Sequence, residues 1–318
     1  MDNIEHRTIF TNGINMHVAS IGAATSGPAI LFLHGFPEFW YSWRHQLCFF
    51  SNLGYRVFAP DLRGYGDSDS PIFFSSYTIF HIVGDLLGLL DYFTIERVFL
   101  VGHDWGAAIA WAFALFRPER IKALVALSVP FTPRDPARNS VEFLRDQFGN
   151  DFYVCRFQEP DMVEEFRSMD PADIFKIIFS IHDPRPPMIP RDTGLVGFPV
   201  PDTLPTWLTE EDLSRYASKF ASNGFYGGLN YYRVLKLNWE LTAPWTRSMV
   251  RVPAKFMIGK MDPTYHIPGV IEYIQKGGFK RDVPLLDTVV EIEGAAHFLN
   301  QERPHQINQH IHDFINRF

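Results

Sequence analysis

The fold of this chain is decided by one stretch, which reads Val98-Phe99-Leu100-Val101-Gly102-His103-Asp104-Trp105-Gly106-Ala107-Ala108. Its first four residues are all apolar, which predicts a strand covered on both faces of a sheet. The pattern G-x-D-x-G follows at Gly102–Gly106, and the small and apolar residues of Ala107–Phe116 predict a helix. A strand, a glycine turn and a helix in direct succession place the central side chain, Asp104, in the open at the helix N-terminus.

Apolar runs of the same kind recur along the chain, and helical patterns separate several of them. The predicted strands, which begin with a hairpin around Asn12-Gly13, are Arg7–Phe10, Ile14–Ile21, Ala29–Leu33, Arg56–Ala59, Val98–Val101, Ile121–Leu127, Ala254–Ile258 and Val289–Ile292. The predicted helices are Trp40–Leu53, Ile79–Phe93, Ala107–Phe116, Pro268–Gln275 and Pro304–Phe318. This alternation predicts an α/β fold in which helices flank a mostly parallel central sheet.

The stretch from Phe131 to Trp245 interrupts the alternation, because it contains no clear buried strand and is rich in Pro, Phe and Met. Its helical patterns are Val141–Phe148, Asp161–Arg167, Pro171–Ile178 and Thr209–Phe220. Seven prolines in Asp183–Pro205 predict an extended loop there. We therefore predict one core domain, residues 1–130 and 246–318, with a helical lid inserted at residues 131–245.

Composition and charge exclude several classes of protein. Hydrophobic residues make up 46% and charged residues 20% of the chain, as in globular proteins. The net charge is −7 without a Lys/Arg run, so we expect no nucleic-acid partner. Two distant cysteines, Cys48 and Cys155, suggest neither a disulfide framework nor a zinc site. The N-terminus lacks a leader pattern and no segment reads as a membrane span, so we expect a cytosolic protein.

The G-x-D-x-G turn resembles the nucleophile elbow of the α/β-hydrolases, in which Ser commonly holds the central position. Aspartate, with an ordinary pKa of about 3.9, is ionised at neutral pH without help from a base. The positive end of the helix dipole favours that anion further. Attack of Asp104 on a saturated carbon that bears a leaving group would give an ester with the enzyme. The alternative is that Asp104 only caps the helix.

In the α/β-hydrolases the acid follows the nucleophile along the chain, and the histidine that acts as the base follows the acid. His297 lies in the small-residue loop Glu293–Phe298, directly after a predicted strand. Asp262 lies shortly after the preceding predicted strand, Ala254–Ile258, and it would orient the imidazole of His297. Asp135, which follows an earlier strand, is the alternative acid.

Hydrolysis of an ester creates an oxyanion, which needs N–H donors already in place. The backbone N–H of Trp105, next to the nucleophile, is one candidate. The second is Phe36, in the loop His34-Gly35-Phe36-Pro37 that follows a predicted buried strand. Two polar neighbours of these loops, His103 and Glu38, could position the hydrolytic water.

Five stretches, in order along nearly the whole chain, resemble the soluble epoxide hydrolases and most closely the plant-type ones. They are His34-Gly35-Phe36-Pro37, Asp61-Leu62-Arg63-Gly64-Tyr65-Gly66-Asp67-Ser68-Asp69, Gly102-His103-Asp104-Trp105-Gly106, Asn230-Tyr231-Tyr232-Arg233 and Gly294-Ala295-Ala296-His297. The resemblance implies conversion of epoxides, fatty-acid and aryl or alkyl epoxides among them, to vicinal diols with water. It implies no cofactor and no metal.

The resemblance also implies two lid tyrosines that donate hydrogen bonds to the epoxide oxygen. The best matches are Tyr153 and Tyr232, with Tyr231 as the alternative for the second. Phenols with an ordinary pKa of about 10 stay protonated at neutral pH, so they can donate to the alkoxide that ring opening releases.

Two other functions share parts of this pattern. A haloalkane or haloacid dehalogenase would use the same Asp-His-Asp logic, but a halide site needs N–H donors rather than two phenols. A non-catalytic ligand receptor on the same fold is the second alternative, and Asp104 argues against it because such receptors keep Ser at that position.

Overall fold

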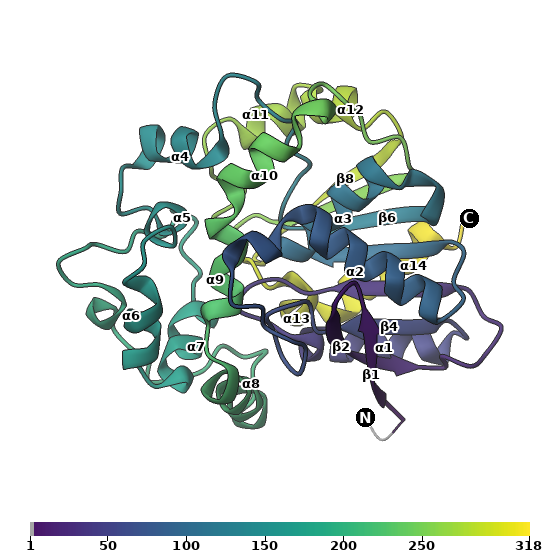
Figure 1. Cartoon of the computed structure of the whole chain (residues 1–318), viewed down its shortest axis with the longest axis horizontal. Coiled ribbons are helices and arrows are strands. Elements are labelled where there is room, and N and C mark those ends of the chain that lie inside the picture. Colours follow the sequence, from purple (N-terminus) through teal and green to yellow (C-terminus); the bar gives the residue numbers. More distant parts are fainter. Residues whose placement is uncertain (1–2) are drawn as a thin grey trace.

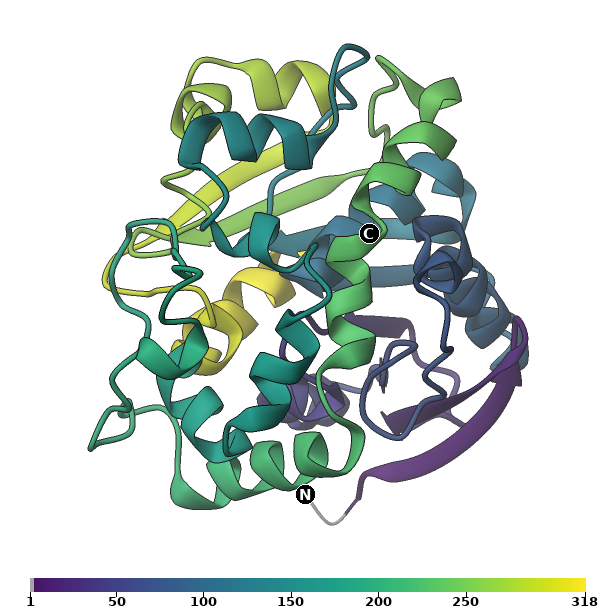
Figure 2. The same ribbon diagram turned by 60° about the vertical axis from the view of Figure 1, so that its left-hand side comes forward.

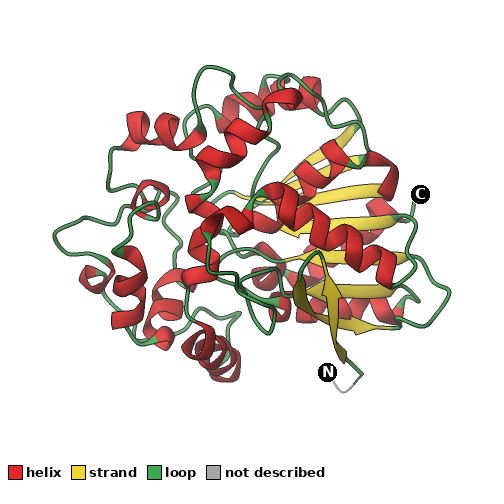
Figure 3. Cartoon of the chain, viewed as in Figure 1, coloured by secondary structure: helices red, strands yellow, loops and turns green. Residues whose placement is uncertain are grey.

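The structure is a computed structural model that describes residues 3–318. An eight-stranded sheet lies between two layers of helices (Figures 1 and 3), and the strands follow the order β1-β2-β4-β3-β5-β6-β7-β8. The strands are β1 (Glu5–Thr11), β2 (Ile14–Ile21), β3 (Ala29–Leu33), β4 (Arg56–Pro60), β5 (Val98–His103), β6 (Ile121–Leu127), β7 (Ala254–Gly259) and β8 (Leu286–Ile292). Strand β2 pairs antiparallel with β1 and β4, whereas the pairs from β4 to β8 are parallel.

Helices cover both faces of this sheet, which explains why its central strands are apolar throughout. The core helices are α1 (Arg44–Asn52), α2 (Ile79–Tyr92), α3 (Trp105–Phe116), α11 (Val270–Gln275), α12 (Gly278–Asp282), α13 (Leu299–Glu302) and α14 (Pro304–Ile315). Side chains of α1 and α14, such as Phe50 and Ile311, pack on one face, and those of α2 and α3, such as Leu86 and Phe113, pack on the other. All residues of β3 and β5 are buried between them.

A helical insertion separates β6 from β7 in the chain. Its helices are α4 (Ser140–Phe148), α5 (Tyr153–Arg156), α6 (Met162–Ser168), α7 (Pro171–Phe179), α8 (Glu210–Asn223), α9 (Tyr226–Arg233) and α10 (Leu235–Leu241). Figure 2 shows this insertion in front of the sheet, at the end where β5 and β7 finish. Carboxyl ends of parallel strands are where α/β proteins bind ligands, so the insertion closes over the expected place of the site.

The eight predicted strands and five predicted core helices are confirmed, with small differences in their bounds. The predicted helix at residues 40–53 is divided, because Trp40–Trp43 forms a 3₁₀ turn before α1 begins at Arg44. Helix α3 begins at Trp105 rather than Ala107, directly after the turn at Asp104. The proline-rich segment at residues 183–205 is a loop as predicted, apart from a short 3₁₀ turn at Leu195–Gly197.

Three helices of the insertion, α5, α9 and α10, were not predicted. Helix α9 contains Gly227 and Gly228, which disfavour a helix. A Cβ atom at Gly227 would lie 2.0 Å from the carbonyl oxygen of Gly64, and one at Gly228 would lie 2.5 Å from the ring of Phe36. The two glycines thus allow α9 to approach the core, at a contact that the local sequence does not reveal.

Among residues 3–318 no helix is both long enough and apolar enough to span a lipid bilayer.

Candidate active site

Asp104 stands on a strained turn between β5 and α3. Its backbone angles, φ 53° and ψ −119°, are unusual for a residue with a side chain. A Cβ atom at Gly102 would come within 2.2 Å of the carbonyl oxygen of Gly106, and one at Gly106 within 2.0 Å of that of Leu33. Both glycines of the G-x-D-x-G pattern are therefore required for the close packing of strand, turn and helix, as an elbow demands.

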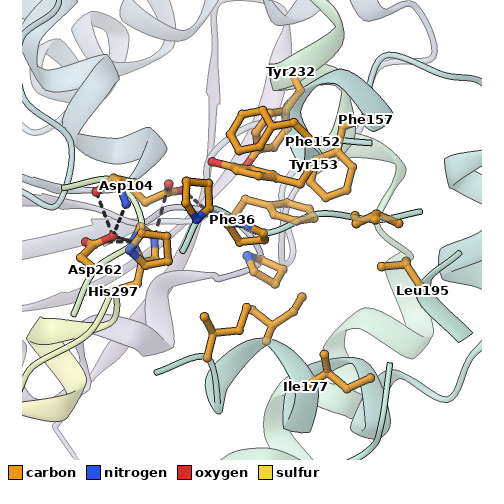
Figure 4. A pocket seen from close by; sticks show the side chains of 18 of the residues that line it. Phe36, Asp104, Phe152, Tyr153, Phe157, Ile177, Leu195, Tyr232, Asp262 and His297 are labelled. Atoms are coloured by element: carbon orange, nitrogen blue, oxygen red, sulfur yellow. Dashed lines mark hydrogen bonds and ion pairs between the residues drawn. The ribbon is translucent and has the colours of Figure 1, made fainter. Parts of the chain in front are cut away.

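Two loops bring His297 and Asp262 to this turn (Figure 4). His297 follows β8, and its Nε2 atom lies 3.5 Å from Oδ2 of Asp104. Its Nδ1 atom lies 3.0 and 3.1 Å from the two carboxylate oxygens of Asp262, which follows β7. The alternative acid, Asp135, lies at the surface, where its carboxylate is 4.0 Å from Arg138. The structure therefore places His297 between Asp104 and Asp262, which is the arrangement expected of a catalytic triad.

The charged forms of Asp104, Asp262 and His297 stabilise one another. Burial by itself would raise the pKa of Asp104, but His297 outweighs it and holds this pKa below its usual value. Burial would likewise raise the pKa of Asp262, but the positive charge of His297 outweighs burial and lowers this pKa. Burial disfavours the imidazolium of His297, yet the carboxylates of Asp262 and Asp104 raise the pKa of His297 well above its ordinary value. The three shifts all favour two carboxylates and one imidazolium.

Phe36 meets the nucleophile from the loop after β3. Its backbone N–H donates a hydrogen bond of 2.8 Å to Oδ1 of Asp104. Trp105 is the first residue of α3, where a backbone N–H has no acceptor within its own helix. Gly35 allows this approach, because a Cβ atom there would lie 2.4 Å from Oδ1 of Asp104. The Phe36 donor thus meets the carboxylate of Asp104 directly, and the role of the Trp105 N–H stays a prediction.

Glu38 and His103 lie behind this loop and are fully buried. Oε2 of Glu38 accepts one hydrogen bond, of 3.0 Å, from the backbone N–H of Gly35. The same oxygen lies 2.9 Å from Nδ1 of His103. Nε2 of His103 lies 2.8 Å from the backbone carbonyl oxygen of His297. Neither residue lines the cavity described below. Their observed contacts fix the Phe36 loop and the His297 loop, and a role toward water stays a prediction.

Tyr153 and Tyr232 face Asp104 from the insertion (Figure 4), with ring centroids 6.0 Å apart. Burial and the negative charge of Asp104 raise the pKa of both phenols, so both remain protonated. Tyr231, the alternative to Tyr232, turns away, because its hydroxyl group donates to the carbonyl oxygen of Arg63 at 2.8 Å. The pair of phenols near Asp104 is therefore Tyr153 and Tyr232.

A cavity of about 140 Å³ opens between the triad and the insertion. Six of its lining residues carry polar groups, namely Asp104, Tyr153, Tyr232, Asp262, Thr264 and His297. The other lining residues are apolar, and include Phe157, Ile177 and Leu195 on the side away from the triad (Figure 4). A site with few polar groups at one end and apolar walls elsewhere suits a small apolar molecule with one reactive polar group.

Two residues with hydroxyl side chains support the triad and were not predicted from the sequence. Thr264 donates from both its backbone N–H (2.9 Å) and its hydroxyl group (2.8 Å) to Oδ1 of Asp262. The spacing of two residues after an aspartate is the signal that could have identified Thr264, since Asp commonly bonds the backbone two residues on. Ser128, which donates to the carbonyl oxygen of His297 at 2.9 Å, lies far away in the chain and has no such signal.

One group of side chains elsewhere has the composition of a metal site. His17, Asp61 and Asp67 present ligand atoms within 4.8 Å of one another. Nδ1 of His17 already lies 2.7 Å from Oδ2 of Asp61, and Asp67 accepts from Nζ of Lys219 at 2.7 Å. These contacts satisfy the group without an ion.

Comparison with known proteins agrees with this geometry. Residues 28–170 match the family model described as "alpha/beta hydrolase fold". "Epoxide hydrolase 3" of Siraitia grosvenorii is 60% identical over 100% of both chains, and "Epoxide hydrolase A" of Mycobacterium tuberculosis is 37% identical over 97% of this chain and 96% of its own. The structure of potato epoxide hydrolase I superimposes with a TM-score of 0.95 at 52% identity, covering 99% of this chain and 100% of its own. The chain therefore belongs to the epoxide hydrolases of plant type, within the α/β-hydrolase fold.

Proposed function

We propose that this protein hydrolyses epoxides to vicinal diols in two half-reactions at Asp104. The observation that carries the proposal is the arrangement of four side chains around one apolar cavity: the carboxylate of Asp104, the imidazole of His297 and the protonated phenols of Tyr153 and Tyr232. The names of the relatives given above support the same reaction. A carboxylate nucleophile attacks saturated carbon, and an epoxide supplies such a carbon with an oxygen leaving group.

In the first half-reaction an oxygen of Asp104 forms a bond to one epoxide carbon, and the bond from that carbon to the ring oxygen breaks. The products are an ester of Asp104 and an alkoxide. Tyr153 and Tyr232 stabilise the alkoxide by donating hydrogen bonds. The net proton that the alkoxide takes up comes from the imidazolium of His297, which leaves the imidazole neutral.

In the second half-reaction the neutral imidazole of His297 removes a proton from water, which attacks the ester carbonyl carbon of Asp104. Formation of the ester has removed one of the two negative charges beside His297, so imidazole is a competent base at this stage. The N–H groups of Phe36 and Trp105 stabilise the tetrahedral oxyanion. When it collapses, the ester C–O bond breaks and the departing oxygen takes the proton of the hydroxyl group that water supplied. The diol leaves neutral, Asp104 regains its carboxylate with one oxygen from water, and His297 is again an imidazolium.

The cavity walls favour apolar epoxides. Apart from the triad, Thr264 and the two phenols, the lining offers hydrocarbon and aromatic surface only. We therefore propose fatty-acid and aryl or alkyl epoxides as the substrate class, with water as the second reactant. We propose residues 131–245 as the lid that carries the two phenols and most of these walls, over a core of residues 1–130 and 246–318. The cytosolic location expected from the sequence stays a prediction.

A single turnover in water enriched in ¹⁸O tests this mechanism. With enzyme in excess over styrene oxide, the label should enter the side chain of Asp104, where peptide mass spectrometry detects it, and the first diol should contain none. Label that appears directly in the first diol would exclude the ester. Incubation with 1-chlorobutane separates the dehalogenase alternative, since we expect no release of chloride.

A further inference from the structure

The short helix that carries Tyr153 cannot hold its own position. Helix α5 has only four residues, Tyr153–Arg156, and isolated helices of that length are unstable in water. Contacts with other segments must therefore fix Tyr153 over Asp104. Arg156, at the other end of the same helix, makes several of these contacts.

Arg156 is a buried cation at the centre of three carboxylates. Only 1% of its side chain is exposed, and its guanidinium group forms ion pairs with Glu159 and Glu165 and lies 3.5 Å from Asp161. Removal of a charge from water is costly unless its partners are well placed. The position of α5 is thus tied to that of Glu165, which lies on α6.

Glu165 also holds the outer wall of the cavity. One of its oxygens pairs with Arg156, and the other accepts a hydrogen bond of 3.1 Å from the backbone N–H of Leu195. Leu195 lines the cavity on the side away from the triad, whereas Tyr153 lies near Asp104 (Figure 4). A Cβ atom at Gly194 would come within 2.7 Å of Glu165, so the loop is pressed closely against this carboxylate.

The same loop, residues 183–205, is attached to α5 at a second place. The backbone N–H of Tyr153 donates to the carbonyl oxygen of Pro187 at 3.2 Å, and that of Ile189 donates to Asp151 at 2.6 Å. The loop therefore runs from beside Tyr153 to the far wall at Leu195. It is anchored to α5 at the first place and, at the second, to Glu165 of α6, the ion-pair partner of Arg156.

We propose that Arg156 and Glu165 are positioning residues that fix the distance between Tyr153 and the wall at Leu195, and so set how long a substituent the epoxide can carry. This inference rests on the proposed function. Because neither side chain lines the cavity, both act on the reaction only through the residues that they hold. A change at this pair should therefore alter the discrimination between short and long epoxides more than the chemistry at Asp104.

Glu165→Gln is the sharpest test, because it keeps the shape of the side chain. An amide has one acceptor end and one donor end, so it cannot accept from both Arg156 and Leu195. We expect kcat/KM for trans-stilbene oxide to fall about 10-fold, mainly through KM. Over many turnovers of styrene oxide in water enriched in ¹⁸O, the ratio of label at the two diol carbons should also change. Arg156→Met should in addition slow ring opening of styrene oxide, since it releases Tyr153, and Arg156→Lys should recover part of that loss.

Arg167→Gln is the matched control. Arg167 lies on the same helix α6 and pairs with Glu164 at 2.7 Å, but both side chains are about 70% exposed. We expect this variant to match the wild type. Equal behaviour of Glu165→Gln and Arg167→Gln in selectivity and KM would overturn the proposal, even if Glu165→Gln melted at a lower temperature.

Binding of trans-stilbene, which has no epoxide ring, separates this inference from the proposed function. Its affinity, followed by fluorescence, should weaken in Glu165→Gln and not in Arg167→Gln. If the wild type turned over no epoxide, but Glu165→Gln bound trans-stilbene more weakly than Arg167→Gln did, the proposed function would be excluded and the role of Glu165 in the cavity wall would stand. If the wild type turned over epoxides, but both variants bound trans-stilbene with the wild-type affinity, the proposed function would stand and the role of Glu165 would be excluded.

Discussion

Nε2 of His297 lies 3.5 Å from Oδ2 of Asp104, so the base and the nucleophile face each other as an ion pair before substrate binds. The raised pKa of His297 and the lowered pKa of Asp104 express the same contact from its two sides. This pairing keeps Asp104 ionised for attack. Ester formation then removes one of the two negative charges that hold the proton on His297, the other being that of Asp262, so each half-reaction prepares the group that the next one needs.

The raised pKa of His297 predicts a pH dependence of stability. The folded protein keeps a proton that the unfolded chain releases near pH 6.5, so this contribution is fully present below that pH and is lost as the pH rises through the folded pKa. The free energy of unfolding of the wild type, minus that of His297→Gln, should fall by up to about 1.4 kcal/mol per pH unit above pH 6.5. Urea unfolding between pH 6 and 9.5 measures it. A difference that does not change with pH would contradict the ion pair.

Asp104→Asn should abolish turnover. An amide of the same size keeps the turn but is not a nucleophile, and loss of a nucleophile commonly costs a factor of about 10³ or more in kcat. Diol formation from styrene oxide, measured immediately after purification, checks this expectation. Circular dichroism should show an unchanged fold. Activity within 10-fold of the wild type would remove Asp104 from the mechanism.

His297→Gln should stop the reaction at the ester. In this variant the two phenols still donate to the alkoxide, which takes its proton from water in place of His297, whereas hydrolysis of the ester lacks its base, so the intermediate should accumulate. Intact-protein mass spectrometry after treatment with styrene oxide should show a gain equal to the mass of the epoxide. The variant Asp104→Asn, treated identically, should show no gain. A His297→Gln protein that binds the epoxide without gaining mass would speak against two-step chemistry.

The two candidate acids can be separated by a pair of matched substitutions. Asp262→Asn should reduce kcat by a factor of up to about 10⁴, because an amide beside Nδ1 no longer fixes the useful tautomer or stabilises the imidazolium. Asp135→Asn should leave steady-state kinetics with styrene oxide unchanged, since Asp135 lies at the surface. The opposite pattern would exchange the two assignments.

The core of the fold could be predicted from the sequence because its strands are covered on both faces, so burial leaves a local apolar signal. The triad was accessible for the same reason, since Asp104, Asp262 and His297 each follow such a strand. The insertion was harder to predict. Gly227 and Gly228 disfavour a helix locally, and only the approach of Gly64 and Phe36 explains why α9 needs them.

Residues whose role depends on a partner brought close only by folding have no recognisable sequence motif, so they could not be predicted. Ser128 reaches His297, and Arg156 reaches Glu165, by contacts that depend on the folded chain. Tyr153 was predicted only through the family resemblance, since an aromatic residue in an apolar segment is commonly wall packing. Long-range geometry, and not residue type, distinguishes these side chains from their neighbours.

Tyr153 and Tyr232 should share the work of ring opening. Each phenol can donate one hydrogen bond to the alkoxide, so removal of one leaves the other in place, and removal of both leaves a strongly basic oxygen without a donor. We expect Tyr153→Phe and Tyr232→Phe each to slow ester formation about 10-fold or more, and the double variant to slow it far more than either.

Rapid mixing of enzyme with trans-stilbene oxide, followed by acid quench and mass spectrometry of the ester, measures that rate directly. Tyr231→Phe, which removes the neighbouring phenol bonded to the carbonyl oxygen of Arg63, serves as the control and should form the ester at the wild-type rate. Because burial and Asp104 raise the pKa of both active-site phenols, the rate should not fall through phenol ionisation up to pH 9.5. A double variant that formed the ester at the wild-type rate would exclude both phenols from ring opening.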